Sequence, residues 1–515
     1  MILRLLIIFL LFRSVIVMAE ESAAFDIFEF QVSGNTVLSS KKIEDAVYPF
    51  MGEHKTIDDV EKARAALEQV FHNDGYLTVF VNIPEQKVEH GVVSLNVLEG
   101  KVGKLRVVGS QYYSLGEIKS RVPQLAEGTV PNFPLVQQEL ASVNSADRRV
   151  APVLRAGDTP GKVDVDLKVS DSLPFHGDVE LNNKNSVNTT DTRLSGSIRY
   201  ANLWQKDHSI NLSFQVSPQN TDEVKVLSGT YLVPRQNGDF IAAYSIVSKS
   251  NVSAVGDTTV IGDGVISGIR YIHPLPSIIG LTHTFTAGVD YKDFNQSTGV
   301  QGADRVNTPI SYTPFYVGYD ANILGEHSNG QVSASIVFSL KGVGNNESDF
   351  NNKRYLASSN YAYLKLSGKY AEDVYKKWQI SARFTAQAAD GPLISNEQFA
   401  VGGYDSVRGY YESTALGDSG VYGTLELRTP SFADHFSKNI SDFYALAFYD
   451  AGYTYVMDAL PGQTERYHLE SSGFGIYLKD WKGFFTTLDF AMAMRDAAPV
   501  KSGDARVLFR IGYNW

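Results

Sequence analysis

Two short motifs carry the residues with the most specific chemistry in this sequence. The first motif consists of Val407, Arg408, Gly409 and Tyr410, and the second of Phe448, Asp450 and Gly452. A guanidinium and a carboxylate that meet can form two parallel hydrogen bonds, a strong and directional contact. Gly409 would permit close backbone approach, and Tyr410 would pack against Phe448. We therefore predict an Arg408–Asp450 ion pair that pins one segment of the chain to another.

Composition excludes several other kinds of chemistry. The 515 residues include no cysteine, so disulfides, thiolate metal sites and cysteine nucleophiles are excluded. The 57 acidic and 46 basic residues give a net charge of −11, which argues against a nucleic-acid partner. The sequence contains neither His-Glu-x-x-His nor Gly-x-Ser-x-Gly, and residues 157–162 lack the pattern of a phosphate loop. We expect no enzymatic activity, no cofactor and no metal.

The N-terminus has the features of an export signal. Arg4 precedes an apolar stretch that Arg13 interrupts, and Ala19 stands before two glutamates. This order predicts a signal peptide over residues 1–19. A retained membrane anchor is the alternative, but the apolar run is short for a membrane span. The mean hydropathy of −0.15 argues against a polytopic helical membrane protein, although it permits a transmembrane barrel.

From residue 172 onward, apolar and polar residues alternate along segments of about 10 to 13 residues. The last segment alternates from Ala505 to Trp515. A soluble sandwich would bury the apolar face between two sheets, whereas a membrane barrel turns it to lipid. The segment length favours the barrel, and so do the charges on the polar face, which a dry core would not tolerate. These charges include Lys365, Asp489, Arg506 and Arg510.

We predict about 16 antiparallel strands in a closed barrel over residues 172–515, because an open sheet edge in lipid would leave backbone groups unbonded. The predicted strands begin near His176, Asp191, His208, Glu223, Asp239, Thr258, Leu281, Thr308, Gln331, Ser358, Lys377, Gly420, Asp442, His468, Lys482 and Asp504. A long polar connection over about residues 390–419 contains the arginine motif.

The residues before the barrel read as two similar α+β modules, at 20–99 and 100–171. In the first, Thr56 begins a capping-box pattern before residues at helical spacing, and alternating strands follow. Val32-Ser-Gly34 recurs as Val107-Val-Gly109, which indicates a tandem repeat. Two unrelated α/β domains are the alternative to a tandem.

The modules and motifs together resemble a known family. Asp74-Gly-Tyr76, Gly91 and Val97-Leu-Glu99-Gly100 are similar to the end of a POTRA domain, and residues 144–161 are similar to the second such domain. The arginine motif resembles that of the long loop that folds back into the barrel of two-partner secretion transporters, the TpsB family, which is related to outer-membrane assembly proteins. The motif around Asp450 resembles the family's barrel-wall motif. The resemblance covers about residues 25–515.

The resemblance implies a transporter in the outer membrane of a Gram-negative bacterium, with its POTRA domains in the periplasm. Its partner would be a secreted exoprotein of haemolysin, adhesin or haem-acquisition type that carries an N-terminal secretion domain. Outer-membrane lipids and the barrel assembly machinery would also be partners, and the protein would be a monomer. The alternatives are an assembly factor that inserts other barrels and, from another class, a diffusion porin.

Three further expectations follow from the same resemblance. The Arg408–Asp450 pair either takes part in transport or only stabilises the barrel, and both readings stay open. Some members plug the pore with an N-terminal helix, but the first strand begins near Phe25 and leaves no room for one. The folded-in loop and other extracellular loops would then close the pore. Trp515 resembles the aromatic C-terminal signal for barrel assembly, although it could be an ordinary interfacial aromatic residue.

Overall fold

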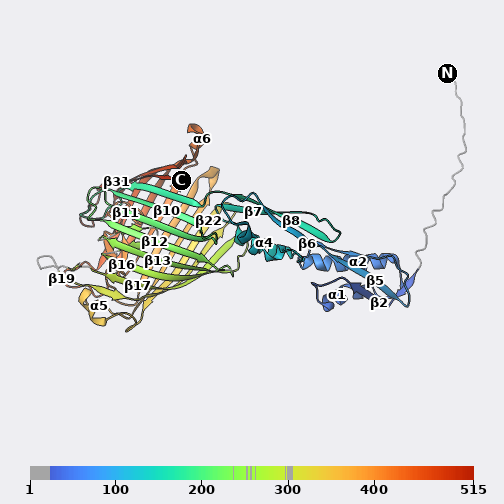
Figure 1. Ribbon diagram of the computed structural model, residues 1–515. Coiled ribbons are helices and arrows are strands. Elements are labelled where there is room, and N and C mark those ends of the chain that lie inside the picture. The colour runs from blue at the N-terminus through green and yellow to red at the C-terminus, as the bar shows by residue number, and fades with distance from the viewer. Residues whose placement is uncertain are drawn as a thin grey trace, which may run out of the picture. The chain divides into compact units, whose positions relative to one another are not determined.

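The computed structural model describes residues 24–235, 237–250, 253–255, 258–260, 263–295, 297–298 and 306–515 (Figure 1). The chain divides into two compact units, and the boundary lies between Ser172 and Leu173. The predicted signal peptide, residues 1–19, lies outside the described residues. Within the described residues, none of the helices has the length and apolar character needed to cross a membrane.

The first unit begins with a small sheet covered by two helices. Its chain order is β2 (Glu29–Ser33), α1 (Ser40–Val47), α2 (Ile57–Asn73), β4 (Val79–Asn82) and β5 (Val92–Glu99). The sheet order is β2-β5-β4, with β2 parallel and β4 antiparallel to β5. A separate pair, β1 (Phe25–Ile27) with β3 (Gly52–Lys55), and the turn η1 (Tyr48–Phe50) complete this part.

A second module repeats this topology. It consists of β6 (Lys101–Val108), α3 (Leu115–Ser120), η2 (Pro123–Leu125), α4 (Phe133–Val143), β7 (Arg148–Ala156) and β8 (Lys162–Asp171). The sheet order is β6-β8-β7, with β6 parallel and β7 antiparallel to β8. The two sheets and their helix pairs therefore correspond element by element.

The glycine of the sequence repeat has the same role in both modules. Gly34 and Gly109 follow the first strand of the three-stranded sheet in their modules, β2 and β6, with φ angles of 85° and 94°. A Cβ atom would lie 2.2 Å from the carbonyl oxygen of Val97 at Gly34, and 2.5 Å from that of Val169 at Gly109. Only glycine combines this left-handed backbone with so close an approach to the neighbouring strand. The repeat in the sequence therefore reflects one backbone turn that is used twice.

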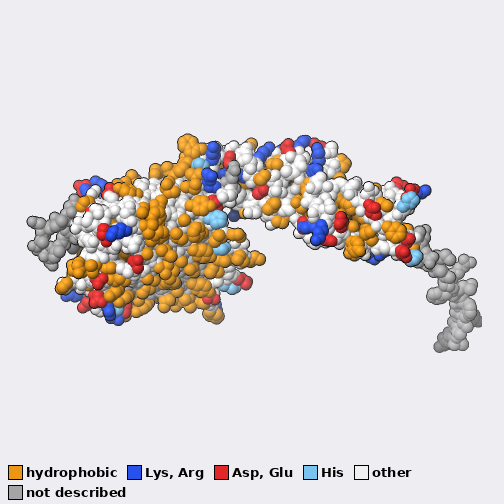
Figure 2. Space-filling view, turned by 90° about the horizontal axis from the view of Figure 1, so that it is seen from below, with side chains coloured by type: hydrophobic (Ala, Val, Ile, Leu, Met, Phe, Trp, Pro, Cys, Tyr) orange, Lys and Arg blue, Asp and Glu red, His pale blue; other side chains and the backbone are white. Residues whose placement is uncertain are grey.

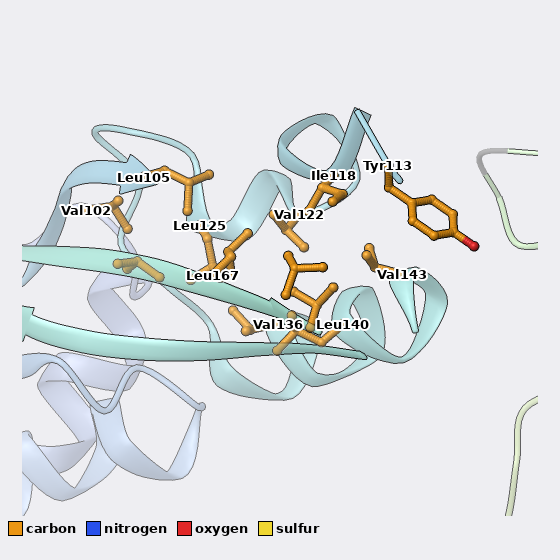
Figure 3. Close-up of a cluster of buried hydrophobic side chains, with 13 residues drawn as sticks. Val102, Leu105, Tyr113, Ile118, Val122, Leu125, Val136, Leu140, Val143 and Leu167 are labelled. Atoms are coloured by element: carbon orange, nitrogen blue, oxygen red, sulfur yellow. The ribbon is translucent and has the colours of Figure 1, made fainter. Parts of the chain in front are cut away.

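Each module buries its own hydrophobic core between sheet and helices. In the second module, strand residues such as Leu167 pack against Ile118 of α3 and Leu140 of α4 (Figure 3). In the first module, α2 begins at a capping box in which the Thr56 amide donates to Asp59 at 2.8 Å. The helix then buries its side chains at helical spacing, at Val60, Ala63, Leu67 and Phe71.

The second unit is a closed antiparallel barrel with 16 strands in the described residues, which confirms the predicted fold class. In order, the strands are β9 (Phe175–Asn182), β10 (Arg193–Leu203), β11 (His208–Val216), β12 (Lys225–Pro234), β13 (Phe240–Lys249), β16 (Gly264–Pro274), β17 (Leu281–Phe294), β20 (Ile310–Tyr312) continued by β21 (Phe315–Leu324), β22 (Ser328–Ser339), β23 (Tyr361–Asp373), β24 (Gln379–Ala389), β27 (Ser419–Arg428), β28 (Ile440–Tyr455), β29 (Arg466–Trp481), β30 (Phe484–Ala493) and β31 (Ala505–Asn514).

One predicted strand start is displaced. Thr258 lies in β15 (Thr258–Val260), which pairs with β14 (Ser253–Val255) in a separate two-stranded sheet, so the sixth barrel strand begins later, at Gly264. A similar short pair, β18 (Ser297–Thr298) with β19 (Val306–Asn307), follows β17. Two short helices, α5 (Glu347–Lys353) and α6 (Ala433–Phe436), and the turn η3 (Tyr375–Lys377) lie in other connections.

The barrel closes where the last strand meets the first. β31 pairs antiparallel with β9 from Arg510↔Asn182 to Asn514↔Asp178. Trp515 extends this seam, because its amide donates to the carbonyl of Gly177 at 3.0 Å. Closure satisfies the strand edges that lipid could not hydrogen-bond.

The outer wall of the barrel is apolar. Figure 2 shows a broad area of hydrophobic side chains on the outside of the barrel. Alternate residues of the strands form it, because successive side chains point to opposite faces. Exposed members include Leu212, Phe214, Ile269, Ile336, Leu364, Phe384, Leu425 and Ile476. This surface is the kind that lipid solvates.

Asp171, at the end of β8, holds the loop after β6 of the second module. Its carboxylate accepts hydrogen bonds from the amides of Gln111 and Tyr112, each at 3.0 Å, and from Ser110 Oγ at 2.9 Å. Burial raises the pKa of Asp171, but the hydrogen bonds from Tyr112, Gln111 and Ser110 outweigh it and hold the pKa below its usual value. The ionised carboxylate therefore stabilises the folded module.

Asp171→Ala should destabilise this loop by about 1–3 kcal/mol, because a charged acceptor of three hydrogen bonds is lost. Amide hydrogen exchange of residues 105–115 in the full-length protein would measure it. The difference from the wild type should be present above the unfolded pKa of about 3.9 and disappear as pH falls through the lower folded pKa. Asp158→Ala is the control, because that exposed carboxylate forms a surface ion pair with Lys104 and should change exchange little. Equal effects of both variants would contradict the assignment.

Candidate functional site: the folded-in loop

The connection between β24 and β27, residues 390–418, packs against the inner wall of the barrel. It contains a short hairpin of β25 (Phe399–Val401) and β26 (Ala415–Gly417). Val401, Val407 and Tyr410 are fully buried, and they share a cluster with Leu469 of β29 and Ala493 of β30. A loop that buries its apolar side chains against several barrel strands has a defined position in the lumen.

Arg408 meets Asp450 of β28 as the sequence predicts. The guanidinium donates through Nε to Oδ2 and through Nη2 to Oδ1, both at 2.9 Å, and the Arg408 amide donates to Oδ2 at 3.1 Å. Arg408 is 2% exposed and Asp450 is fully buried. The structure therefore brings both predicted residues into one bidentate contact that excludes solvent.

Two more carboxylates surround the same guanidinium. Arg408 Nη2 lies 3.0 Å from Glu426 Oε1 of β27, and Nη1 lies 3.8 Å from Asp489 Oδ1 of β30. Tyr477 of β29 donates its hydroxyl to Asp489, at 2.9 and 3.0 Å to the two oxygens. One loop cation thus separates three wall carboxylates that would otherwise repel one another in a buried site.

The aromatic residue of the wall motif stacks on the arginine. The guanidinium carbon of Arg408 lies 3.4 Å from the centre of the Phe448 ring, a cation–π contact. Phe448 fits there because Gly473 of β29 has no side chain, and a Cβ atom would lie 2.5 Å from the ring. The prediction that Tyr410 packs against Phe448 is wrong, because the two rings belong to separate hydrophobic clusters.

Tyr410 instead anchors the loop through its hydroxyl. Two carbonyl oxygens can accept its single proton, that of Arg495 at 2.8 Å and that of Glu470 at 3.1 Å, and the hydroxyl oxygen accepts from the Arg495 amide at 3.2 Å. Gly409 allows the loop to come this close, because a Cβ atom would lie 2.9 Å from Ser471 Cβ. Tyr410 therefore fixes the loop to β29 and to the residues that follow β30, beside the strand that carries Asp450.

The final glycine of the wall motif provides space for the loop. A Cβ atom at Gly452 would lie 2.5 Å from Val401 Cγ1 and 3.0 Å from Val407 Cγ2. In this motif, Phe448 stacks on Arg408 and Asp450 forms the ion pair with it. Gly452 leaves space for the loop side chains of Val401 and Val407.

A second anchor lies at Glu397, which sequence analysis did not single out. Its carboxylate accepts from Lys292 Nζ of β17 at 2.6 Å and from the Tyr363 hydroxyl of β23 at 2.8 Å, and it also binds the hydroxyl of Tyr312. These partners come from β17, β20 and β23, whereas Arg408 contacts β27, β28 and β30. The loop is therefore attached to two separate groups of barrel strands.

A third anchor joins the loop to a neighbouring connection. Asp418 is fully buried and forms an ion pair with Arg354, in which Nη2 lies 2.7 Å from Oδ2. The same carboxylate accepts from the amides of Leu393 at 2.9 Å and Met457 at 2.7 Å. A buried carboxylate with this many donors fixes the base of the loop.

The loop also contacts the strands that close the barrel. Lys184, just after β9, donates to Asp405 at 2.8 Å, and the guanidinium of Arg506 on β31 stacks 3.6 Å from the centre of the Tyr411 ring. Periodicity could not predict these partners, because they are distant in sequence. The sequence does indicate which loop residues form such contacts, because the connection with the arginine motif also carries acidic residues at 397, 405 and 418.

The predicted assembly signal, Trp515, lies at the seam between β31 and β9. The side chain of Trp515 is 46% exposed and stacks on Tyr513, with ring centres 6.2 Å apart. In the described part of the chain, no group of three or more His, Asp or Glu side chains is arranged to hold a metal ion.

Arg408→Ala should loosen the loop more than Asp450→Ala. Removing the guanidinium leaves the buried carboxylates of Asp450 and Asp489, and the partly buried Glu426, without this cation, at a cost of about 3–5 kcal/mol. Removing Asp450 leaves Arg408 with Glu426 and Asp489, so the cost should be smaller. Amide exchange of residues 402–412 in the full-length protein would measure both. The control is Asp405→Ala, since that carboxylate is 61% exposed and should contribute only about 0–1 kcal/mol. The reverse order of the two main variants would refute the charge argument.

Gly452→Ala should displace the loop by steric overlap, at a cost of about 1–3 kcal/mol. Adding Val401→Ala should restore much of the loop's protection from exchange, because it removes the nearer clash. Gly391→Ala is the matched control, since a Cβ atom there meets nothing within 4 Å. If the second substitution gave no rescue, the crowding would lie elsewhere.

Comparisons with known proteins agree with this architecture. Residues 25–100 match the POTRA domain, ShlB-type, and residues 313–478 match the family described as haemolysin secretion/activation protein ShlB/FhaC/HecB. The second match includes both motifs of the Arg408–Asp450 contact. The two matches thus fall on both units of the chain.

Curated relatives span most of the chain. The outer membrane transporter CdiB of Escherichia coli O6:K15:H31 (strain 536 / UPEC) is 23% identical over 428 residues, 80% of this chain and 70% of CdiB. The heme/hemopexin transporter protein HuxB of Haemophilus influenzae (strain 86-028NP) is 21% identical over 433 residues, 78% of this chain and 71% of HuxB.

Solved structures share the fold. CdiB from Escherichia coli superposes with a TM-score of 0.68 at 18% identity, covering 97% of this chain and 92% of CdiB. CdiB from Acinetobacter baumannii gives a TM-score of 0.61 at 15% identity, covering 96% and 91%. The chain therefore carries a ShlB-type POTRA domain and a region of the ShlB/FhaC/HecB family, the family of two-partner secretion transporters of the outer membrane.

Proposed function

We propose that this transporter recognises one exoprotein through its two N-terminal modules in the periplasm and passes it through the barrel lumen. The observation that carries the proposal is the loop fixed inside the lumen by the buried Arg408–Asp450 contact. A diffusion pore has no need of N-terminal modules, and the comparisons favour secretion over barrel assembly. The comparisons support a secretion role, and the proposal adds that the N-terminal modules recognise the secreted partner.

Exposed strand edges support recognition of an extended segment. β2 of the first module and β7 of the second each pair with one neighbour among the described residues, β5 and β8 respectively. An unfolded chain can add to such an edge through main-chain hydrogen bonds, which bind many sequences. We infer that the exoprotein docks in this way before it enters the barrel.

The class of cargo and the other partners follow from the family. HuxB carries the name heme/hemopexin transporter protein, which supports a cargo of haemolysin, adhesin or haem-acquisition type. We also infer that outer-membrane lipids contact the apolar wall, that the barrel assembly machinery inserts the chain with Trp515 as a signal, and that the transporter works as a monomer.

Deletion of the gene in its native host should remove one large exoprotein from the culture medium and leave other barrel proteins in the outer membrane. The wild-type gene should restore secretion. Arg408→Ala should restore it several-fold less well at equal barrel levels, while the control Asp405→Ala should restore it fully. Quantitative proteomics of medium and outer membrane would measure this. Loss of many barrel proteins would identify an assembly factor instead, and full secretion with Arg408→Ala would assign the pair to stability alone.

A further inference from the structure

The lumen wall formed by β23 and β24 carries three basic side chains, Lys365, Lys369 and Arg383. Tyr363, on the same strand, donates to Glu397 of the folded-in loop at 2.8 Å, so this face of β23 points into the lumen. Side chains alternate along a strand, so Lys365 and Lys369 share that face. Both lysines are exposed. Their side chains therefore reach into the lumen rather than into packed protein.

Arg383 of β24 belongs to the same face. Gln387, four residues later, donates to the carbonyl of Glu397 at 3.1 Å, which places this face of β24 toward the loop as well. In the β23–β24 register, Arg383 lies directly opposite Lys369. Like charges at directly opposed positions destabilise a sheet. The opposed charges of Lys369 and Arg383 therefore destabilise the sheet, so the needs of the sheet do not explain them.

Within the described part of the chain, none of these three cations forms an ion pair. Two acidic groups that attract these cations already have partners. Glu397, which attracts Lys365, is bound by Lys292, and Asp405, which attracts Arg383, is bound by Lys184. Arg383 Nε is buried and has no hydrogen-bond partner among the described residues. A buried donor without an acceptor is uncommon in folded proteins.

Several other lumen cations are neutralised by carboxylates. Arg270 pairs with Asp290 at 2.6 Å, Arg428 with Asp442 at 2.6 Å, and Arg510 with Glu180. The barrel wall can thus supply carboxylate partners to its basic residues, yet Lys365, Lys369 and Arg383 on β23 and β24 have no such partner among the described residues. Basic residues without ion-pair partners that line a low-dielectric wall concentrate positive potential there and attract anions.

We propose that Lys365, Lys369 and Arg383 form a transient docking surface for acidic segments of the polypeptide that passes through the lumen. The proposal rests on the secretion function proposed above. The loop is pinned through Arg408 to the wall of β27, β28 and β30, so the basic cluster lies on other strands than this anchor. Exposed lysines hold carboxylates weakly and release them readily, which suits a surface that a chain must leave again.

The test uses the full-length purified protein in planar lipid bilayers, with synthetic oligo-glutamate as the probe. Oligo-glutamate should interrupt the ionic current at about tenfold lower concentration than oligo-glutamine of the same length, and the difference should shrink as salt is raised above about 0.1 M. The double variant Lys365→Gln/Lys369→Gln should abolish the difference. The control Lys376→Gln/Lys377→Gln removes two charges from the exposed turn that joins the same strands and should retain it.

Three results would overturn the proposal: equal interruption by both peptides in the wild type, an unchanged difference in the lumen variant, or equal loss in the control variant. Gel migration without heating would verify that both variants form barrels. Because no exoprotein is present, the current measurement fails or succeeds independently of the deletion experiment. Normal secretion with no preference for oligo-glutamate would rule out the docking surface but would still support the transport function.

Discussion

The backbone hydrogen bonds of the closed sheet are the constraint on which the rest of this molecule depends. A strand in lipid cannot leave its amides and carbonyls unbonded, so β31 must return to β9. Closure then fixes one face of every strand toward lipid and the other toward the lumen. That division explains why the sequence alternates and why its mean hydropathy is close to that of soluble proteins.

The polar lumen makes the folded-in loop possible. A loop that enters an apolar core would bury its backbone without partners, whereas this one finds charged and hydroxyl groups on the wall. Arg408 neutralises carboxylates from three strands, and Glu397 binds side chains of β17, β20 and β23. Because the wall supplies buried charges in advance, the loop and barrel are coupled electrostatically, and neither is fully satisfied without the other.

The N-terminal unit follows a different rule, since its modules must each bury a core in a small volume. Both do so with two helices on one face of a three-stranded sheet, and both turn after their first strand at a glycine, Gly34 or Gly109. The strand edges left by this topology are short. A unit built this way offers main-chain hydrogen bonds to an extended segment without providing a deep pocket.

Local pattern was enough to predict the fold class. Alternation marked the barrel strands because lipid and lumen impose period two, and helical spacing after Thr56 marked α2 because one face packs on a sheet. Local pattern failed at Thr258, where a short hairpin alternates as a barrel strand does. Periodicity records which face is buried, but it does not record which sheet a strand joins.

The site divides in the same way. Sequence alone determined that a loop arginine and a strand aspartate stand in motifs whose chemistry matches, so their pairing could be predicted. Only the tertiary structure decided that Glu426 and Asp489 share the guanidinium, that Arg408 rather than Tyr410 covers Phe448, and that Glu397 forms a second anchor. Those contacts join residues up to 105 positions apart, and they arise from strand register and barrel curvature, which no local pattern encodes.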